Sequence, residues 1–259
     1  MNTTNPSLHA SHRRRSDQPH RLQTVGMACL LLTPLVAVAA DIARMVAEQT
    51  GALVGMIGAS GADETTAMFA AIEAHRGTYQ LASWLALIAA ILAIPGVAAV
   101  RRLTADRSPR WSMAATITGI CLVAGEFVHL MGYYAWNQIL TALPDRTAAV
   151  AVVDLTGQNV FGQVVFAPYL IGVLLFWPFA AAALWRSRAI PVWALVLVLV
   201  GGLVMMVAGS SYLTSPVWAI ATTVGLTPAL VTQLRSARTA ASSSAMAATE
   251  VSTSSSVVR

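Results

Sequence analysis

The chain has 259 residues, of which 56% are hydrophobic and 10% are charged, and its mean hydropathy is +0.66. A soluble domain carries about a quarter charged residues, so this composition excludes an ordinary soluble domain and predicts a bilayer-embedded protein. All 16 basic residues are arginines, against 11 acids. They stand in short clusters between apolar stretches, which indicates membrane topology and not nucleic-acid binding.

The first apolar stretch follows a polar, basic segment, residues 1–21, for which the composition predicts disorder. The first membrane span is predicted at about residues 22–43. Asp41, Arg44 and Glu48 are spaced three and four residues apart, which predicts that the helix continues beyond the span.

A secretory signal is the alternative interpretation of this N-terminal region. Basic residues, an apolar stretch and the small residues Ala37-Val38-Ala39 resemble a cleavable signal peptide. Removal of residues 1–39 would leave five spans, whereas retention gives six.

The next part of the chain predicts an external segment, 44–76, followed by a second span at 77–100. Glycines within the external segment recur at near-helical spacing, which fits either a close-packed helix face or a flexible loop; they are Gly51, Gly55, Gly58 and Gly61. A helix capped by Ser60 or Asp63 is predicted to run from Glu64 into the second span.

The third span is predicted at 111–136 and the fourth at 160–185. The external segment between them, 137–159, includes a stretch of mixed polarity at 146–155. That stretch predicts a short amphipathic helix at the membrane interface, and the two external segments together predict a small cap over the bundle.

The last apolar region predicts two spans, because it is too long for one. Ala189–Leu234 has no charge in 46 residues, and as a single helix it would be roughly 70 Å long. Gly, Ser and Pro residues between 209 and 216 predict a turn, which gives spans at 190–208 and 216–234. The bundle thus covers residues 22–238, and the Ser/Thr/Ala-rich tail, 239–259, is predicted to be disordered.

Charge distribution predicts the orientation of these spans. Of the 16 arginines, 13 fall in the two termini or in the loops between spans two and three and between four and five. The positive-inside rule makes that side cytoplasmic. We therefore predict an all-α, polytopic membrane helix bundle of about six transmembrane helices in the plasma membrane, with both termini cytoplasmic.

A polar stripe in the third span is the predicted functional site. Glu126, His129, Tyr133 and Asn137 fall on one helix face at 100° per residue. A carboxylate this deep in a membrane is costly, so Glu126 is expected to face protein and to be paired or protonated. The predicted partners on other helices are Gln163 and Tyr169, with further polar candidates at Ser83, Thr222, Thr223 and Thr227.

Two interpretations of this stripe stay open: a proton, ion or ligand site, and a structural cluster of hydrogen bonds. Glu126-x-x-His129 matches half of a di-iron carboxylate motif, but no other deep acid completes the site. A metal held between His75 and His129 is less favoured than a solvated His75. No metal or cofactor is therefore predicted, and the common enzyme motifs are absent from the sequence.

One stretch of the sequence resembles a known group of proteins. Ala183-Leu184-Trp185-Arg186-Ser187-Arg188-Ala189-Ile190-Pro191-Val192-Trp193, with Leu92-Ala93-Ile94-Pro95-Gly96, resembles uncharacterised six-span integral membrane proteins of actinobacteria. The resemblance implies the same topology. It implies no activity, because none is assigned to that group.

Three functions remain after these exclusions. The favoured one is a membrane protein that handles a small solute or ion, or senses a ligand, through the stripe at Glu126 and His129. The second is a structural or accessory subunit, in contact with copies of itself or with a membrane partner protein. The third is a membrane enzyme that acts on a lipid or quinone, although an enzyme is the less favoured class.

Overall fold

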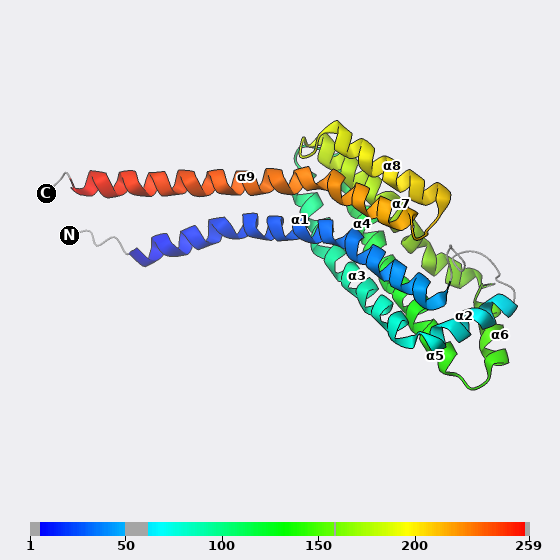
Figure 1. Ribbon diagram of the computed structural model, residues 1–259. Helices are drawn as coiled ribbons and strands as arrows, with labels where there is room; N and C mark the ends of the chain where they lie inside the picture. The colour runs from blue at the N-terminus through cyan, green and yellow to red at the C-terminus, as the bar shows by residue number, and fades with distance from the viewer. Residues whose placement is uncertain (1–5, 50–61, 158, 257–259) are drawn as a thin grey trace.

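The computed structural model describes residues 6–49, 62–157 and 159–256, and every regular element in those residues is a helix (Figure 1). The long helices, in chain order, are α1 (Pro6–Glu48), α3 (Arg76–Thr104), α4 (Pro109–His129), α7 (Val160–Arg186), α8 (Val192–Ala208) and α9 (Thr214–Ser256). A π-helix, η1 (Leu130–Ala135), and α5 (Trp136–Ala142) continue α4. Two shorter helices, α2 (Ala62–Ala74) and α6 (Arg146–Gly157), complete the fold.

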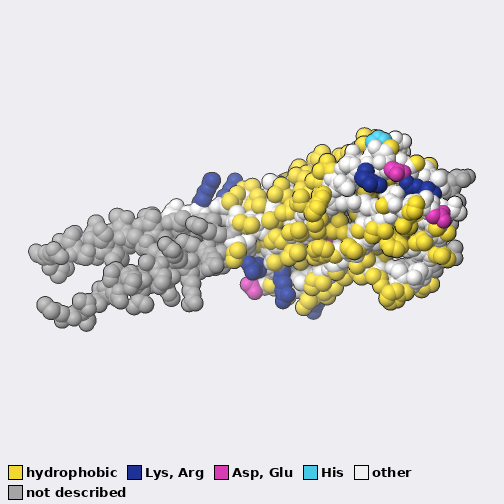
Figure 2. All heavy atoms as spheres, turned by 90° about the horizontal axis from the view of Figure 1, so that it is seen from below, with side chains coloured by type: hydrophobic (Ala, Val, Ile, Leu, Met, Phe, Trp, Pro, Cys, Tyr) yellow, Lys and Arg dark blue, Asp and Glu magenta, His cyan; other side chains and the backbone are white. Residues whose placement is uncertain are grey.

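The lengths of these helices match a bilayer. Five apolar segments of 23 to 34 residues are long enough to cross a membrane, and α8 adds a shorter one of 17. At 1.5 Å per residue α8 spans about 26 Å, close to the hydrocarbon thickness of about 30 Å. On the face shown in Figure 2, charged side chains lie toward the two ends of the bundle with a mainly hydrophobic surface between them. The prediction of a polytopic helical membrane bundle is confirmed.

Small side chains hold the bundle together. Helix α1 packs against α3 and α9, α4 packs against α7 and α3, and α8 packs against α9 and α7. The core combines a few large rings, such as Phe176 and Trp177, with many buried alanines, including Ala93, Ala180 and Ala183. Lipid supplies no hydrophobic drive for helix association, so close packing of small residues supplies the contact energy instead.

A cap of two short helices covers one end of the bundle (Figure 1). Phe69 of α2 and Ala149 and Val150 of α6 pack in one cluster with Leu140 of α5. The predicted amphipathic helix at 146–155 is confirmed as α6. The predicted continuous helix from Glu64 into the second span is wrong, because the backbone leaves helical geometry at His75 (φ −115°, ψ 32°). That break separates α2 from α3 and lets α2 pack across the cap.

The first and last helices of the chain, α1 and α9, extend beyond the bundle at its other end (Figure 1). The structure continues α1 through residues 6–21 and α9 through residues 239–256, for which the composition predicts disorder. Alanine favours helix in the C-terminal stretch, but a helix without tertiary contacts is marginal in water. The predicted domain boundaries stay predictions. The glycines at 51–61, for which a helix face and a flexible loop both stay open, lie outside the described residues.

Candidate functional site

Three charged side chains lie along one face of the last two turns of the apolar part of α1. Arg44 donates from Nη2 to Asp41 Oδ1 and from Nη1 to Glu48 Oε2, both at 2.7 Å. Their spacing of three and four residues brings them together on the helix, as predicted. The Glu48 side chain is fully buried and that of Arg44 is 10% exposed. Ions this deep are stable only when they are paired and hydrogen-bonded.

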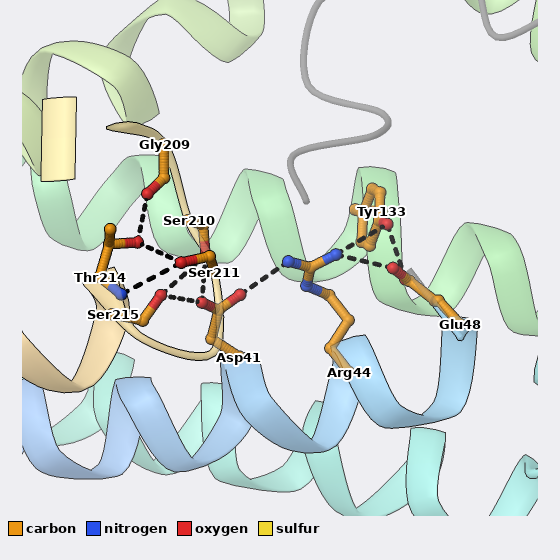
Figure 3. A network of polar contacts seen from close by, with 9 residues as sticks. All are labelled: Asp41, Arg44, Glu48, Tyr133, Gly209, Ser210, Ser211, Thr214 and Ser215. Atoms are coloured by element: carbon orange, nitrogen blue, oxygen red, sulfur yellow. Dashed lines mark hydrogen bonds and ion pairs between the residues drawn. The ribbon is translucent and has the colours of Figure 1, made fainter. Parts of the chain in front are cut away.

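Tyr133 of η1 joins this group from a second helix (Figure 3). Its hydroxyl donates to Glu48 Oε1 at 2.7 Å and accepts a long contact from Arg44 Nη1 at 3.5 Å. The Arg44 guanidinium also lies 5.8 Å from the centre of the Tyr133 ring. Tyr133 therefore fixes the end of α1 against η1.

The turn between α8 and α9 supplies the third side of the group (Figure 3). Ser215 donates to Asp41 Oδ2 at 2.7 Å, and Ser210 donates to the same oxygen. The two serine hydroxyls are 2.9 Å apart. We call Asp41, Arg44, Glu48, Tyr133, Ser210 and Ser215 the outer charged cluster. It connects α1, η1 and the α8–α9 turn.

Removing the Tyr133 hydroxyl should weaken this connection. We expect Tyr133→Phe to lower the free energy of unfolding by about 1.5–3 kcal/mol, because a hydrogen bond to a buried carboxylate is lost. Tyr212→Phe is the matched control, since no hydrogen bond of that partly exposed ring is seen. Denaturant titration of both purified variants measures the difference. Equal stability of the two would contradict the role of Tyr133 in the cluster.

An aromatic stack lies directly beside the outer charged cluster. The His129 ring lies between those of Tyr169 and Tyr133, with centroid distances of 4.4 and 5.2 Å and interplanar angles of 17° and 21°. Tyr134 and Phe166 contact the same imidazole from its sides, at 5.4 and 5.8 Å. We call these five residues the aromatic stack.

One polar atom of the stack has no partner. His129 is 7% exposed, and its Nδ1 atom is buried without a hydrogen bond. Leaving a polar nitrogen unsatisfied in a nonpolar environment costs about 1–3 kcal/mol. Such atoms are rare in folded proteins, and their presence calls for an explanation such as a ligand, a water molecule or a proton.

The π-helix determines which rings reach His129. In an α-helix Tyr133 lies one turn above His129, whereas Tyr134 points about 140° away. The wider η1 turn uses i→i+5 bonding, so Tyr133 and Tyr134 both contact the imidazole. Short π-helical segments occur frequently at functional sites.

The predicted site residues do not form one group in the structure but take part in several separate contacts. The His129 ring contacts that of Tyr133, and the Tyr169 ring contacts the His129 ring from α7. Asn137 instead donates to Tyr79 Oη at 3.2 Å. Gln163 is exposed near the start of α7, one turn before Phe166.

Glu126 lies one turn deeper than His129 on α4 and is partly exposed on the bundle. It forms no hydrogen bond or ion pair with a described side chain. Within the described residues no group of three His, Cys, Asp or Glu side chains is placed to hold a metal ion. Of the other polar candidates, Ser83 accepts from Gln138 at 2.9 Å.

Comparison with protein families assigns the chain to one family. Residues 31–237 match the family model described as Domain of unknown function (DUF4386). The chain belongs to the DUF4386 family. No match is found among curated proteins or among solved structures. The description of the family gives no function, so the function of this DUF4386 protein is argued from its site alone.

The sequence pattern missed most of the outer charged cluster. In the sequence Asp41, Arg44 and Glu48 have the position of ordinary charges at the outer membrane boundary. The available signal was their spacing on a helix that follows an apolar span. Three charged side chains on one helix face at such a place are expected to pair with one another and to form further hydrogen bonds. Nothing in the sequence indicated that Ser210 and Ser215 of this DUF4386 protein would close the cluster from the last turn.

Proposed function

We propose that this multi-pass membrane protein handles a small solute or ion, or senses one, through the aromatic stack and the outer charged cluster beside it. The observation that supports this proposal is the buried, unpartnered Nδ1 of His129, whose ring is stacked with those of Tyr133 and Tyr169. A hydrogen-bonding group of a small flat solute, a water molecule or a proton would satisfy that atom. Glu126, one turn deeper, would supply a second group that binds a proton or a cation.

The arrangement of the two groups supports a gated site. The outer charged cluster holds the ends of α1, η1 and the α8–α9 turn together, on the side of the stack toward the outer end of the bundle. Competition for Arg44 by an anionic group would weaken these contacts. Opening there would uncover the aromatic stack to the outer solvent, if the arginine-rich end lies in the cytoplasm as proposed.

Two variants test this function. Proton flux is measured with the protein in vesicles that contain a pH-sensitive dye and carry an imposed pH gradient. In a separate assay, the melting temperature of the protein is measured with a panel of small amines, imidazoles and carboxylates. We expect His129→Ala and Glu126→Gln to reduce proton flux or solute-dependent stabilisation at least tenfold. Thr227→Ala, an exposed position on α9, is the control and should change neither.

The outcome separates binding from structure. Normal membrane accumulation with lost flux or lost stabilisation supports a site. If neither readout depends on His129 and Glu126 in well-folded variants, the proposal is wrong.

The accessory-subunit function has one observation in its favour. Asp41, Arg44 and Glu48 satisfy one another, as expected of a cluster that only positions helices. Co-purification of a stoichiometric membrane partner, together with failure of His129→Ala to accumulate, would favour this second function.

A further inference from the structure

A pocket lies at the opposite end of the bundle from the outer charged cluster. It is an open hollow on the surface of the bundle, with a volume of about 430 Å³. The α7–α8 turn and α9 form its walls, with lining residues Trp185, Arg188, Ala189, Ile190, Pro191, Pro228 and Thr232. The lining is mixed: one arginine and one threonine hydroxyl stand among apolar side chains and an indole ring.

The backbone places Arg188 at this pocket in an unusual conformation. Arg188 has a φ of 63°, in the left-handed region. Its N–H donates to Trp185 O at 2.9 Å and that of Ala189 donates to Leu184 O at 2.8 Å, the two bonds of a Schellman helix end. Glycine or asparagine usually occupies this position, because other side chains are strained there. An arginine at this position therefore indicates that an interaction of its side chain compensates for the backbone strain.

The charge around the pocket is strongly positive. No ion pair of Arg188 with a described side chain is seen, and its side chain is exposed. Among the described side chains at this end, one carboxylate, Asp106, stands among eight arginines: Arg101, Arg102, Arg107, Arg110, Arg186, Arg188, Arg235 and Arg238. Basic pockets between membrane helices on the cytoplasmic side are typical binding sites for anionic lipid headgroups.

We propose that this pocket binds the phosphate of an anionic phospholipid, with the Arg188 guanidinium as its main contact. Ile190, Pro191 and Pro228 provide an apolar wall for the glycerol backbone and the start of an acyl chain. Thr232 donates its hydroxyl hydrogen to Pro228 O at 2.8 Å, so its oxygen remains an acceptor for a headgroup hydroxyl. This mixed lining favours a lipid over free phosphate, because free phosphate has no apolar group that could pack against the apolar wall.

The test compares lipids and two neighbouring arginines. Full-length protein in neutral detergent is mixed with phosphatidylglycerol, phosphatidylcholine, glycerol 3-phosphate or inorganic phosphate, and its melting temperature is measured. We expect phosphatidylglycerol alone to raise the melting temperature of the natural protein by several degrees. Arg188→Gln should lose most of that rise, whereas Arg186→Gln should keep it, because Arg186 lies two residues away and does not line the pocket.

A second variant separates binding from folding. Arg188→Gly relieves the left-handed strain, so it should melt higher than the natural protein without lipid and yet gain little from phosphatidylglycerol. Equal responses of Arg186→Gln and Arg188→Gln would overturn the proposal, since binding would then depend on charge density alone. An equal rise with inorganic phosphate would overturn the choice of a lipid.

Discussion

Replacing Arg44 with methionine is expected to lower the free energy of unfolding by about 3–5 kcal/mol, because the buried Glu48 and the partly buried Asp41 both lose the guanidinium that pairs with them. Glu48 is fully buried, and Asp41 is held by Arg44 and two serines. Methionine keeps the aliphatic part of the side chain and removes the guanidinium, so the loss reports the missing charge and hydrogen bonds together with the space that the guanidinium leaves. Denaturant titration of the purified protein measures the change.

Two matched variants control this experiment. Arg146→Met removes a cap ion pair with Glu73 in which both side chains are partly exposed, and should cost less than about 1 kcal/mol. Adding Glu48→Gln to Arg44→Met should restore part of the loss, because a buried negative charge that no longer faces Arg44 is removed. A double variant no more stable than Arg44→Met alone would contradict the assignment of the loss to unpaired charge.

Gly125→Ala is expected to have the other large effect, because α4 and α7 meet at this residue almost backbone to backbone. A methyl group at Gly125 would lie 2.2 Å from Tyr169 Cα and 2.3 Å from its N atom. Backbone atoms cannot move aside as a flexible side chain would, so the helices must separate. We expect a loss of about 3 kcal/mol or more, above the usual range for an overpacked core.

The same substitution should also disturb the aromatic stack. The close approach at Gly125 brings Tyr169 to 4.4 Å from the His129 ring. Gly132→Ala, in the same span, is the control, because nothing lies within 4 Å of a methyl group there. It should leave stability unchanged or slightly improved. If Gly125→Ala is as stable as Gly132→Ala, the described α4–α7 contact is wrong.

Much of the membrane architecture was predictable because apolar length, turn residues and proline are local signals. The division of Ala189–Leu234 into two helices is an example: the structure ends α8 at Ala208 and begins α9 at Thr214. The continuation of α1 beyond Ala39 was likewise predictable, from the spacing of Asp41 and Arg44.

The site was only partly predictable, because it depends on contacts between distant parts of the chain. Helical periodicity placed His129 and Tyr133 together, but a uniform 100° step cannot anticipate η1, and so Tyr134 was missed. The approach of Ser210 to Asp41 joins residues 169 positions apart, and no local pattern encodes it. Glu126 stood out because it is a lone carboxylate in an apolar helix, and the structure gives it no partner among the described side chains.

The orientation of the bundle is tested most directly by labelling single cysteines in intact cells. In a background with Cys29→Ala and Cys121→Ala, Thr147→Cys on α6 and Ser242→Cys on α9 are treated with a membrane-impermeant maleimide. We expect Thr147→Cys to be labelled in intact cells and Ser242→Cys to be labelled only after lysis. Labelling of Ser242→Cys in intact cells would contradict it, because the outer charged cluster would then face the cytoplasm.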